Sequence, residues 1–411
     1  MKLLIKNISQ LLQVRDESPE FPVSGAKMRA LPLLENAWLT TNNNLIEDYG
    51  IGLFSFGESE FDEIIDASGR IVMPAWCDSH THLVYAGSRE IEFIDKIKGL
   101  SYEEIFERGG GILNSSALLH LTSEADLLTQ ASARLEEIIS YGTGAVEIKS
   151  GYGLNVEDEL KMLRVIRKLK EISPLTIKST FLGAHAVPLN YKGNQGAYVD
   201  MVINEMLPEV AREKLADYID VFCDKGFFTV DETDRILNAA VAYGLIPKIH
   251  ANELDYSGGI QLGVKYKALS VDHLEFTGDD EIAALLGSGT MPTLLPGAAF
   301  FLNMQWAPVR KMIDAGLAVA MASDFNPGSS PSGNMQFILS LGCIKFRMLP
   351  EEAINAVTIN SAYAMGVSDT LGSITRGKIA NLIITKPISC YEYLPYSYGN
   401  NKVERLILNG I

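Results

Sequence analysis

Two histidines separated by one residue, His80 and His82, are the residues of this chain best suited to metal chemistry. They follow an apolar run, Ile71–Cys77, which we expect to be a strand. Side chains two residues apart in extended backbone share a face, so both imidazoles can meet one ion. Alone the pair is a weak signal, because two histidines at this spacing could equally lie on the surface.

Further metal-binding residue types stand at the ends of other apolar runs. His250 ends the segment PKIH, His273 ends SVDH, and Asp324 follows VAMAS. Catalytic groups of a parallel barrel gather at the carboxyl ends of its strands, so four of the six histidines would converge there. Three His or Asp ligands with a water suit zinc, and iron also accepts histidine and carboxylate.

The elements that would position these residues alternate between strands and amphipathic helices. This alternation is typical of the α/β class and, with eight strands, of a (β/α)8 barrel. Helices are expected over Glu157–Ile172, Asp231–Tyr243 and Pro350–Met365, the last with proline in its first turn. The eight candidate strands are Ile71–Cys77, Ala145–Lys149, Ile177–Gly183, Tyr218–Cys223, Pro247–His250, Ala268–His273, Thr290–Leu295 and Ala318–Ser323.

Both ends of the chain carry short β-like segments instead, bounded by turn-forming residues. We therefore predict a smaller β domain built from residues 1–70 and 371–411, beside a barrel over residues 71–370. The long segment 83–122, which includes Gly109, Gly110 and Gly111, is interpreted either as a cover over the barrel mouth or as a flexible connection. The β-like segments are Leu3–Ile8, Asn42–Leu45, Ile51–Phe56, Ala380–Thr385 and Val403–Leu408.

Composition excludes several functional classes. The net charge of −16, from 35 basic and 51 acidic residues, argues against nucleic acid as a partner. No apolar stretch approaches the roughly 20 residues that span a bilayer, and the first residues do not resemble a signal peptide. Four scattered cysteines favour a reducing compartment, so a cytoplasmic protein is expected. An anionic substrate would need a dedicated cation in the site.

The constellation of histidines and aspartate resembles the amidohydrolase superfamily, which places HxH after strand one, a histidine on strands five and six, and an aspartate on strand eight. The resemblance covers the whole chain and implies a composite β-sandwich formed by both termini. It implies one metal ion per chain, zinc or iron, because strand four ends in Cys223 and Asp224, a poor match for the bridging residue of two-metal members. The implied ligands are His80, His82, His250 and Asp324.

Four longer segments resemble, more specifically, the imidazolonepropionase family. This resemblance implies hydrolysis of the cyclic C–N bond of 4-imidazolone-5-propanoate to N-formimidoyl-L-glutamate, in histidine degradation, by a homodimer. The segments are EIKSGYGL at 147–154, FLGAHAVP at 181–188, HANEL at 250–254 and SDFNPGSSP at 323–331.

The same resemblance implies which residues contact the substrate. Arg89 would hold the propionate carboxylate, a role that suits a planar guanidinium. Tyr152 and His185 would contact the ring or its carboxylate. Each has a plainer interpretation, a solvated ion pair for Arg89 and a satisfied buried polar group for the other two. The glutamate end of the product would face Asn326, Gly328 and Ser329.

Three residues are implied in catalysis. Asp324 would accept a proton from the attacking water, and His273 would stabilise the oxyanion or move a proton. Glu253 would contact the substrate and shuttle a proton to or from a ring nitrogen.

Two other functions stay open at this stage. A purine or pyrimidine deaminase of the same superfamily would also use a His250-x-x-Glu253 pattern, but a neutral nucleobase offers Arg89 no carboxylate. A barrel that has lost catalysis and serves as a binding protein would be expected to have lost metal ligands, and here the set is complete.

Overall fold

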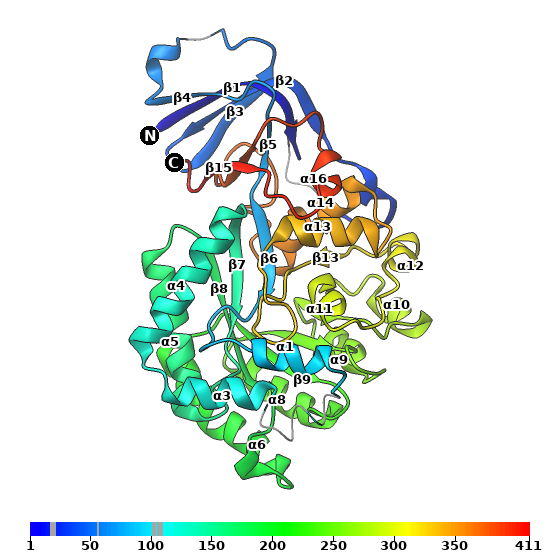
Figure 1. Cartoon of the computed structure of the whole chain (residues 1–411). Coiled ribbons are helices and arrows are strands. Elements are labelled where there is room, and N and C mark those ends of the chain that lie inside the picture. The colour runs from blue at the N-terminus through cyan, green and yellow to red at the C-terminus, as the bar shows by residue number, and fades with distance from the viewer. Residues whose placement is uncertain (17–21, 56, 101–103, 105–109) are drawn as a thin grey trace.

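The structure, a computed structural model, describes residues 1–16, 22–55, 57–100, 104 and 110–411. Strands from both ends of the chain form a sheet at the top of Figure 1, and a barrel with helices around it lies below. The two termini lie near each other in the upper sheet, and the chain passes from this sheet into the barrel along β5 and β6 (Figure 1).

The barrel consists of eight strands in sequence order, and all neighbouring pairs are parallel. It closes between its first strand and the segment after its last. There Asp324 N donates to His80 O (3.0 Å) and His82 N to Phe325 O (2.9 Å). The predicted barrel is therefore confirmed. Its strands are β6 (Trp76–Thr81), β7 (Thr143–Lys149), β8 (Thr176–Ala184), β9 (Tyr218–Cys223), β10 (Ile246–Ala251), β11 (Ser270–His273), β12 (Met291–Leu294) and β13 (Ala320–Met321).

Helices cover the outside of the barrel, and their ends follow capping chemistry. Asn155 accepts a hydrogen bond from Asp158 N at the start of α5, and Thr229 forms a capping box with Glu232 at the start of α8. The helices are α1 (Glu90–Ile97), α3 (Ile112–Leu121), α4 (Glu124–Ser140), α5 (Val156–Ile172), α6 (Gln195–Met201), α7 (Leu207–Glu213), α8 (Val230–Ala242), α9 (Gly259–Lys265), α10 (Asp279–Leu285), α11 (Pro296–Phe301), α12 (Val309–Asp314), α13 (Met335–Ile344), α14 (Pro350–Val357), α15 (Ile359–Ala364) and α16 (Tyr393–Tyr396).

The terminal domain is a mixed sheet of seven strands with its own apolar core. The order is β15-β14-β5-β1-β2-β3, and β4 pairs with β1 beside β5. Leu3, Ile5, Leu39 and Leu382 are fully buried in that core. The strands are β1 (Lys2–Leu12), β2 (Leu33–Asn42), β3 (Leu45–Ile51), β4 (Glu63–Asp66), β5 (Ile71–Pro74), β14 (Leu382–Thr385) and β15 (Val403–Ile407).

The predicted first barrel strand, Ile71–Cys77, is wrong as a single element. Its first half is β5, which pairs with β1 and β14 in the terminal sheet, and only β6 belongs to the barrel. An unbroken apolar run carries no sign of the change of sheet except Pro74, which ends β5. As a consequence His80 lies on the barrel strand itself rather than after it.

Three other expected elements differ from the structure. Residues 43 and 44 form the turn between β2 and β3, so the expected strand Asn42–Leu45 is wrong, and β3 ends at Ile51, where another strand was expected to begin. The helix expected over Pro350–Met365 is two helices, because Thr358 leaves helical geometry (φ −119°, ψ −89°). Its hydroxyl donates to Ile354 O (2.6 Å) and accepts from Gln13 Nε2 (3.0 Å), which links the break to the residue that follows β1.

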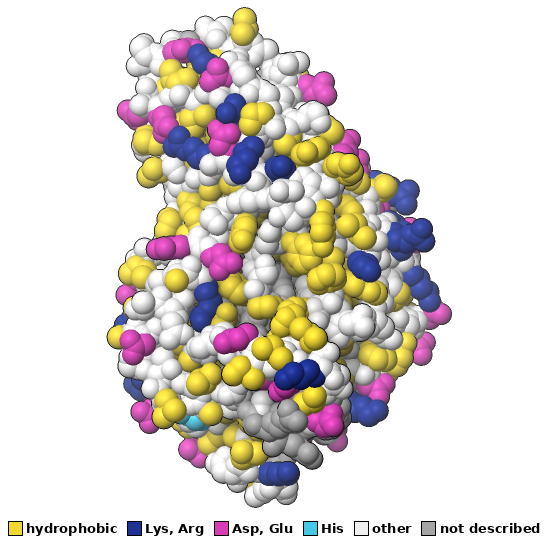
Figure 2. All heavy atoms as spheres, in the orientation of Figure 1, with side chains coloured by type: hydrophobic (Ala, Val, Ile, Leu, Met, Phe, Trp, Pro, Cys, Tyr) yellow, Lys and Arg dark blue, Asp and Glu magenta, His cyan; other side chains and the backbone are white. Residues whose placement is uncertain are grey.

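The surface mixes charges of both signs. In Figure 2, Lys and Arg side chains lie among Asp and Glu side chains and do not gather into one basic area on the face shown. None of the helices in the described part of the chain is long and apolar enough to cross a membrane. All four cysteines are free thiols, and burial raises the pKa of Cys77 to about 12 and of Cys223 to about 11.

We expect Leu382→Ala to destabilise the terminal domain, because it removes a fully buried side chain between β5 and β15. A buried Leu→Ala change costs about 2–5 kcal/mol. Urea unfolding of the full chain measures this cost, with Ile172→Ala on α5 as the control. Ile172 is 65% exposed, so its truncation should change stability by about 0.5 kcal/mol or less. Equal losses in the two variants would contradict this assignment of the core.

Candidate active site

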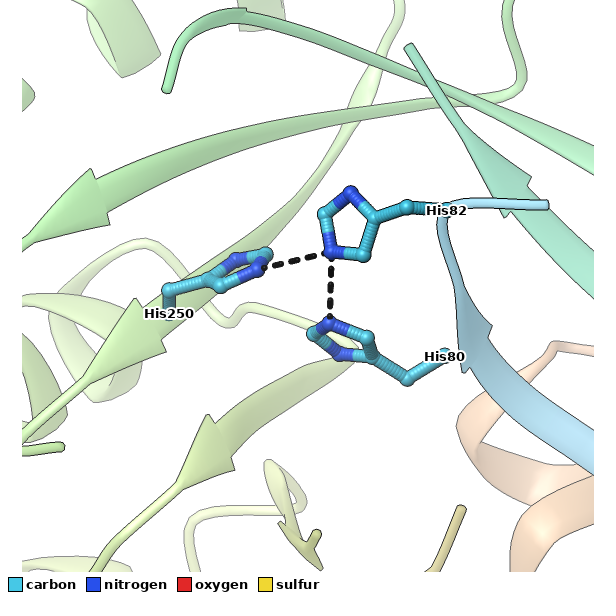
Figure 3. A group of neighbouring side chains, drawn as sticks. All are labelled: His80, His82 and His250. Carbon is cyan, nitrogen blue, oxygen red and sulfur yellow. Dashed lines mark hydrogen bonds between the residues drawn. The ribbon is translucent and has the colours of Figure 1, made fainter. Parts of the chain in front are cut away.

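Three histidines point toward one another at the barrel mouth, two from β6 and its end and one from β10 (Figure 3). His82 Nε2 lies 3.3 Å from His80 Nε2 and 3.4 Å from His250 Nε2. Asp324 Oδ1 lies 3.5 Å from His80 Nε2 and 3.6 Å from His82 Nε2. The structure thus brings all four predicted ligands together, and each is at most 2% exposed.

These spacings fit a metal ion. Four donors at about 2.0–2.1 Å from a tetrahedrally coordinated zinc ion lie about 3.4 Å from one another. Burial lowers the pKa of His80 and of His82 well below the ordinary value, so both imidazoles are neutral and offer lone pairs. The cluster His80, His82 and His250 is a divalent metal site in its donor chemistry and its geometry.

Two buried aspartates hold the far sides of two ligand rings. Asp272 Oδ2 lies 2.6 Å from His80 Nδ1, so the proton of that ring sits on Nδ1 and its Nε2 lone pair faces the cluster. Asp220 accepts from the backbone N of His250 (3.0 Å). Its other oxygen lies 3.0 Å from His250 Nδ1, close but poorly aligned for a hydrogen bond. This pattern of carboxylate, histidine and metal orients the ligands.

Asp324 and His273 both have backbone conformations that side chains with a Cβ rarely adopt. Their φ angles are 53° and 85°. Such conformations cost about 1–3 kcal/mol and cluster at functional sites. At Asp324 the barrel closure fixes the backbone, and Ser329 Oγ donates to Oδ2 (3.3 Å). Burial raises the pKa of Asp324 to about 7.

His273, Glu253 and Glu275 form a second group near the ligands. His273 Nε2 lies 3.6 Å from Glu253 Oε2, and His273 Nδ1 lies 3.9 Å from Glu275 Oε2, both beyond hydrogen-bond distance. Burial raises the pKa of Glu253 well above the usual range, with help from the nearby Asp324 and Asp224 carboxyls. Burial lowers the pKa of His273. Burial thus favours the protonated form of Glu253 and the neutral form of the imidazole beside it.

Arg89 is held by a buried carboxylate and not by solvent. Its Nε and Nη2 donate to Glu92 Oε2 at 2.9 and 2.6 Å, with the two side chains only 9% and 8% exposed. Glu92 also accepts from Gly111 N and Asn114 Nδ2, both at 3.0 Å. A Cβ on Gly328 would lie 2.0 Å from Arg89 Nη1, so this loop packs directly on the guanidinium.

The loop 150–154 carries Tyr152 and supports His185. Gly151 O accepts from His185 Nδ1 (3.0 Å), which leaves His185 Nε2 with a lone pair, and the ring stacks on His82 at 5.1 Å. Glu159 holds this loop from below and accepts from the backbone N of Gly151, Gly153 and Leu154 at 2.7–3.1 Å. One carboxylate thus positions both predicted substrate contacts.

The loop after β13 uses Asn326 internally. Its Oδ1 accepts from Gly328 N and Ser329 N (both 2.8 Å), and its Nδ2 donates to Asp324 O and Ser329 Oγ (both 2.7 Å). All hydrogen-bonding positions of the amide are occupied. The contact of Asn326 with substrate stays a prediction, and in this structure its side chain shapes the loop.

Sequence analysis missed the carboxylates that support the site. They are Asp220, Asp272, Glu92 and Glu159. A further missed carboxylate, Glu275, lies beside His273 without a hydrogen bond to it. Charged residues inside apolar strands, as in YIDVFC and SVDH, could have indicated two of them, since a buried charge requires a partner. Within the proposed cover over the mouth, residues 83–122, residues 101–103 and 105–109 with Gly109 lie outside the described residues.

A parallel barrel with this donor set defines a metal-dependent hydrolase class, and comparison with known families agrees. The model of the amidohydrolase family matches residues 71–411, so the chain belongs to this family. Solved structures with the same fold include a triazine hydrolase variant (TM-score 0.76, 16% identity, covering 100% of this chain and 94% of that one). Another is a 5-methylcytosine deaminase from Klebsiella pneumoniae (TM-score 0.73, 18% identity, 100% and 97%).

Curated relatives narrow the class further. An imidazolonepropionase of Flavobacterium johnsoniae is 58% identical over 410 residues, which cover 100% of this chain and 99% of the relative. One from Brevibacillus brevis is 44% identical, covering 99% and 96%. Within the amidohydrolases, the chain is therefore a member of the imidazolonepropionase family.

We expect Glu159 to make stability depend on pH. Burial raises its pKa from 4.5 to about 7, although three N–H groups favour the ionised form. An acid with a raised pKa in the folded state contributes its full stability below its unfolded value, and loses it as pH rises through 7. The free energy of unfolding of the wild type, minus that of Glu159→Gln, should fall by about 3 kcal/mol between about pH 5 and pH 8. A difference that stays constant with pH would contradict this.

Proposed function

We propose that this enzyme hydrolyses the cyclic C–N bond of 4-imidazolone-5-propanoate to N-formimidoyl-L-glutamate. One juxtaposition supports the choice of substrate: a metal site and a buried guanidinium flank the same tyrosine. Tyr152 is 2% exposed, and its ring centroid lies 6.0 Å from that of the ligand His82. Burial raises the pKa of Tyr152, and the Arg89 charge is the largest effect that lowers it. A small ring with an anionic tail matches a site that has a metal at one side and Arg89 at the other. A neutral nucleobase would offer Arg89 no carboxylate beyond the one that Glu92 already provides.

Different residues of the chain would carry out the separate steps of the reaction. A metal ion held by His80, His82, His250 and Asp324 supplies a Lewis acid and lowers the pKa of water. Asp324, which can bind the metal through one carboxylate oxygen, would take the proton of the attacking water on the other. The water oxygen bonds to the ring carbonyl carbon, and the neutral His273 donates an N–H to the developing oxyanion.

Glu253 would complete the reaction. Burial raises its pKa and so favours the protonated form, which would give its proton to the ring nitrogen as the C–N bond breaks. His185 Nε2 and the Tyr152 hydroxyl would contact the ring. The propionate would bind Arg89, with Ser329 and the backbone of Gly328 beside it.

The metal is proposed to be zinc or iron, one ion per chain, because imidazole and carboxylate donors suit both. We further propose a cytoplasmic homodimer without nucleic-acid or membrane partners. The net charge of −16 and the mixed surface in Figure 2 support the exclusion of nucleic acid.

We expect the hydrolysis of the imidazolone ring to depend on the metal. The purified protein should remove the ultraviolet absorbance of imidazolone propionate, generated in situ from urocanate. The rate should fall at least about a hundredfold after chelation and return with Zn or Fe. Ammonia release is measured in parallel with guanine and cytosine. Deamination of either, without decay of the imidazolone, would instead indicate the deaminase.

We also expect changes at Arg89, the proposed binding residue for the substrate carboxylate, to raise KM. Gly328→Ala should displace the Arg89 guanidinium, since the new Cβ would lie 2.0 Å from Nη1, and Arg89→Met should remove it. Charged hydrogen bonds contribute about 1.5–3 kcal/mol, so KM should rise roughly tenfold to a hundredfold in both variants. In the control, Gly196→Ala on α6, a Cβ meets no atom within 4 Å and KM should not change. An unchanged KM in Arg89→Met would contradict the assignment of the propionate to this residue.

A further inference from the structure

Beneath the metal site lies a fully buried ion cluster that the proposed reaction does not use. It fills the inside of the barrel and comprises Glu147, Lys149, Asp220, Lys248 and Asp272, each 0% exposed. Residues two apart on a strand point the same way, so Lys149 lies on the inner face of β7 with Glu147, and Lys248 on that of β10 with the ligand His250.

We propose that Lys149 is a positioning residue for the metal site, whose ammonium group holds in place the two aspartates that orient His80 and His250. The inference rests on the proposed function only in requiring a metal at the histidine cluster. It does not depend on the identity of the substrate.

The contacts of Lys149 join three strands. Its Nζ donates to Asp220 Oδ2 (2.8 Å) on β9 and to Glu147 Oε1 (2.6 Å) on its own strand, and lies 3.8 Å from Asp272 Oδ2 on β11. The same Oδ2 atoms contact the ligand rings: that of Asp272 lies 2.6 Å from His80 Nδ1, and that of Asp220 lies 3.0 Å from His250 Nδ1. The ammonium group of Lys149 is thus connected to two of the metal ligands, in each case through one intervening aspartate.

The position of Lys149 is itself fixed. Glu147 Oε1, which accepts from Lys149, also accepts from Thr180 Oγ1 (2.6 Å), and its other oxygen pairs with Lys248. Lys248 in turn donates to Ser79 O at 2.9 Å. The ammonium therefore has a defined location before any metal binds.

Removal of this ammonium would take from the buried Asp220 its hydrogen-bonded cation and would reduce the positive charge beside the buried Asp272, on which Lys248 also acts. Buried charges that are less well compensated are unfavourable, so the carboxylates would move apart, admit water or take up protons. Each of these changes loosens the hydrogen bond or contact to a ligand ring. Loss of comparable carboxylate partners weakens metal binding about 10–100-fold.

The experiment measures metal affinity in the full chain, independently of catalysis. Wild type and Lys149→Met are stripped of metal and titrated with Zn²⁺ against a chromophoric chelator, and the rise in Tm on Zn²⁺ addition is recorded. We expect Lys149→Met to bind Zn²⁺ 10–100-fold more weakly and to show a smaller rise in Tm, with an unchanged far-ultraviolet circular dichroism spectrum.

A matched control is Lys248→Met. This lysine is equally buried and contacts the same Glu147. Its charge also acts on Asp272, but its other hydrogen bonds go to backbone oxygens, and none reaches either aspartate. It should lower Tm to a similar extent while the Zn²⁺ affinity stays within about threefold of wild type. Equal loss of affinity in both variants would mean that the cluster acts only through general charge balance, and would overturn the proposal.

A double-mutant cycle covers the case in which Lys149→Met does not fold. Lys149→Gln retains a donor in the cavity, and its effect on Zn²⁺ affinity is combined with that of Asp272→Asn. If Lys149 acts through Asp272, the double variant should lose clearly less affinity than the two single losses combined. Independent effects, or wild-type affinity in the Lys149 variant, would overturn the proposal.

A wild type that binds Zn²⁺ but does not open the imidazolone ring would instead refute the proposed substrate and leave the role of Lys149 standing.

Discussion

The close approach of four lone-pair donors at the barrel mouth is the constraint on which the rest of this structure depends. Three imidazole nitrogens and a carboxylate oxygen lie 3.3–3.6 Å from their neighbours in the group, away from solvent. Donors at such spacing repel one another unless a cation lies between them, so the fold must hold them there by other means. Barrel closure holds three of the donors in place. The hydrogen bonds between the first strand and the segment after β13 involve the backbone of His80, His82 and Asp324 themselves.

Charged side chains in the barrel interior also help to hold the ligands in place. Most barrels fill this space with branched apolar side chains, whereas here ammonium groups and carboxylates occupy it. Buried ion pairs of this kind are weak contributors to stability, because desolvation offsets their attraction. Their role is to fix the positions of side chains. Glu147 fixes the ammonium group of Lys149, and Lys149 in turn fixes the two aspartates that contact the ligand rings. The apolar stabilisation comes from elsewhere, namely the helices outside the barrel and the separate core of the terminal sheet.

The sequence allowed the barrel and the four donors to be predicted, because both depend on local patterns. An apolar run followed by histidine or aspartate marks a strand and its carboxyl end. The supporting carboxylates were missed because their partners are set by strand order and shear, which pair Asp272 with His80 across 192 residues. The split between β5 and β6 was missed for a related reason, since an apolar run looks the same whichever sheet it joins. The break at Thr358 depends on a distant hydrogen bond from Gln13.

Two of the predicted substrate contacts, Arg89 and Tyr152, are held by residues other than the metal ligands, whereas Asn326 and Ser329 hydrogen-bond to the ligand Asp324. Arg89 depends on Glu92 and on the start of α3, and Tyr152 depends on Glu159 through the backbone of its loop. None of these contacts passes through a metal ligand or through the ion cluster in the barrel. A barrel built in this way can change what it recognises by altering α1, α3 and the loop after β7, while the ligands and the charges beneath them stay the same.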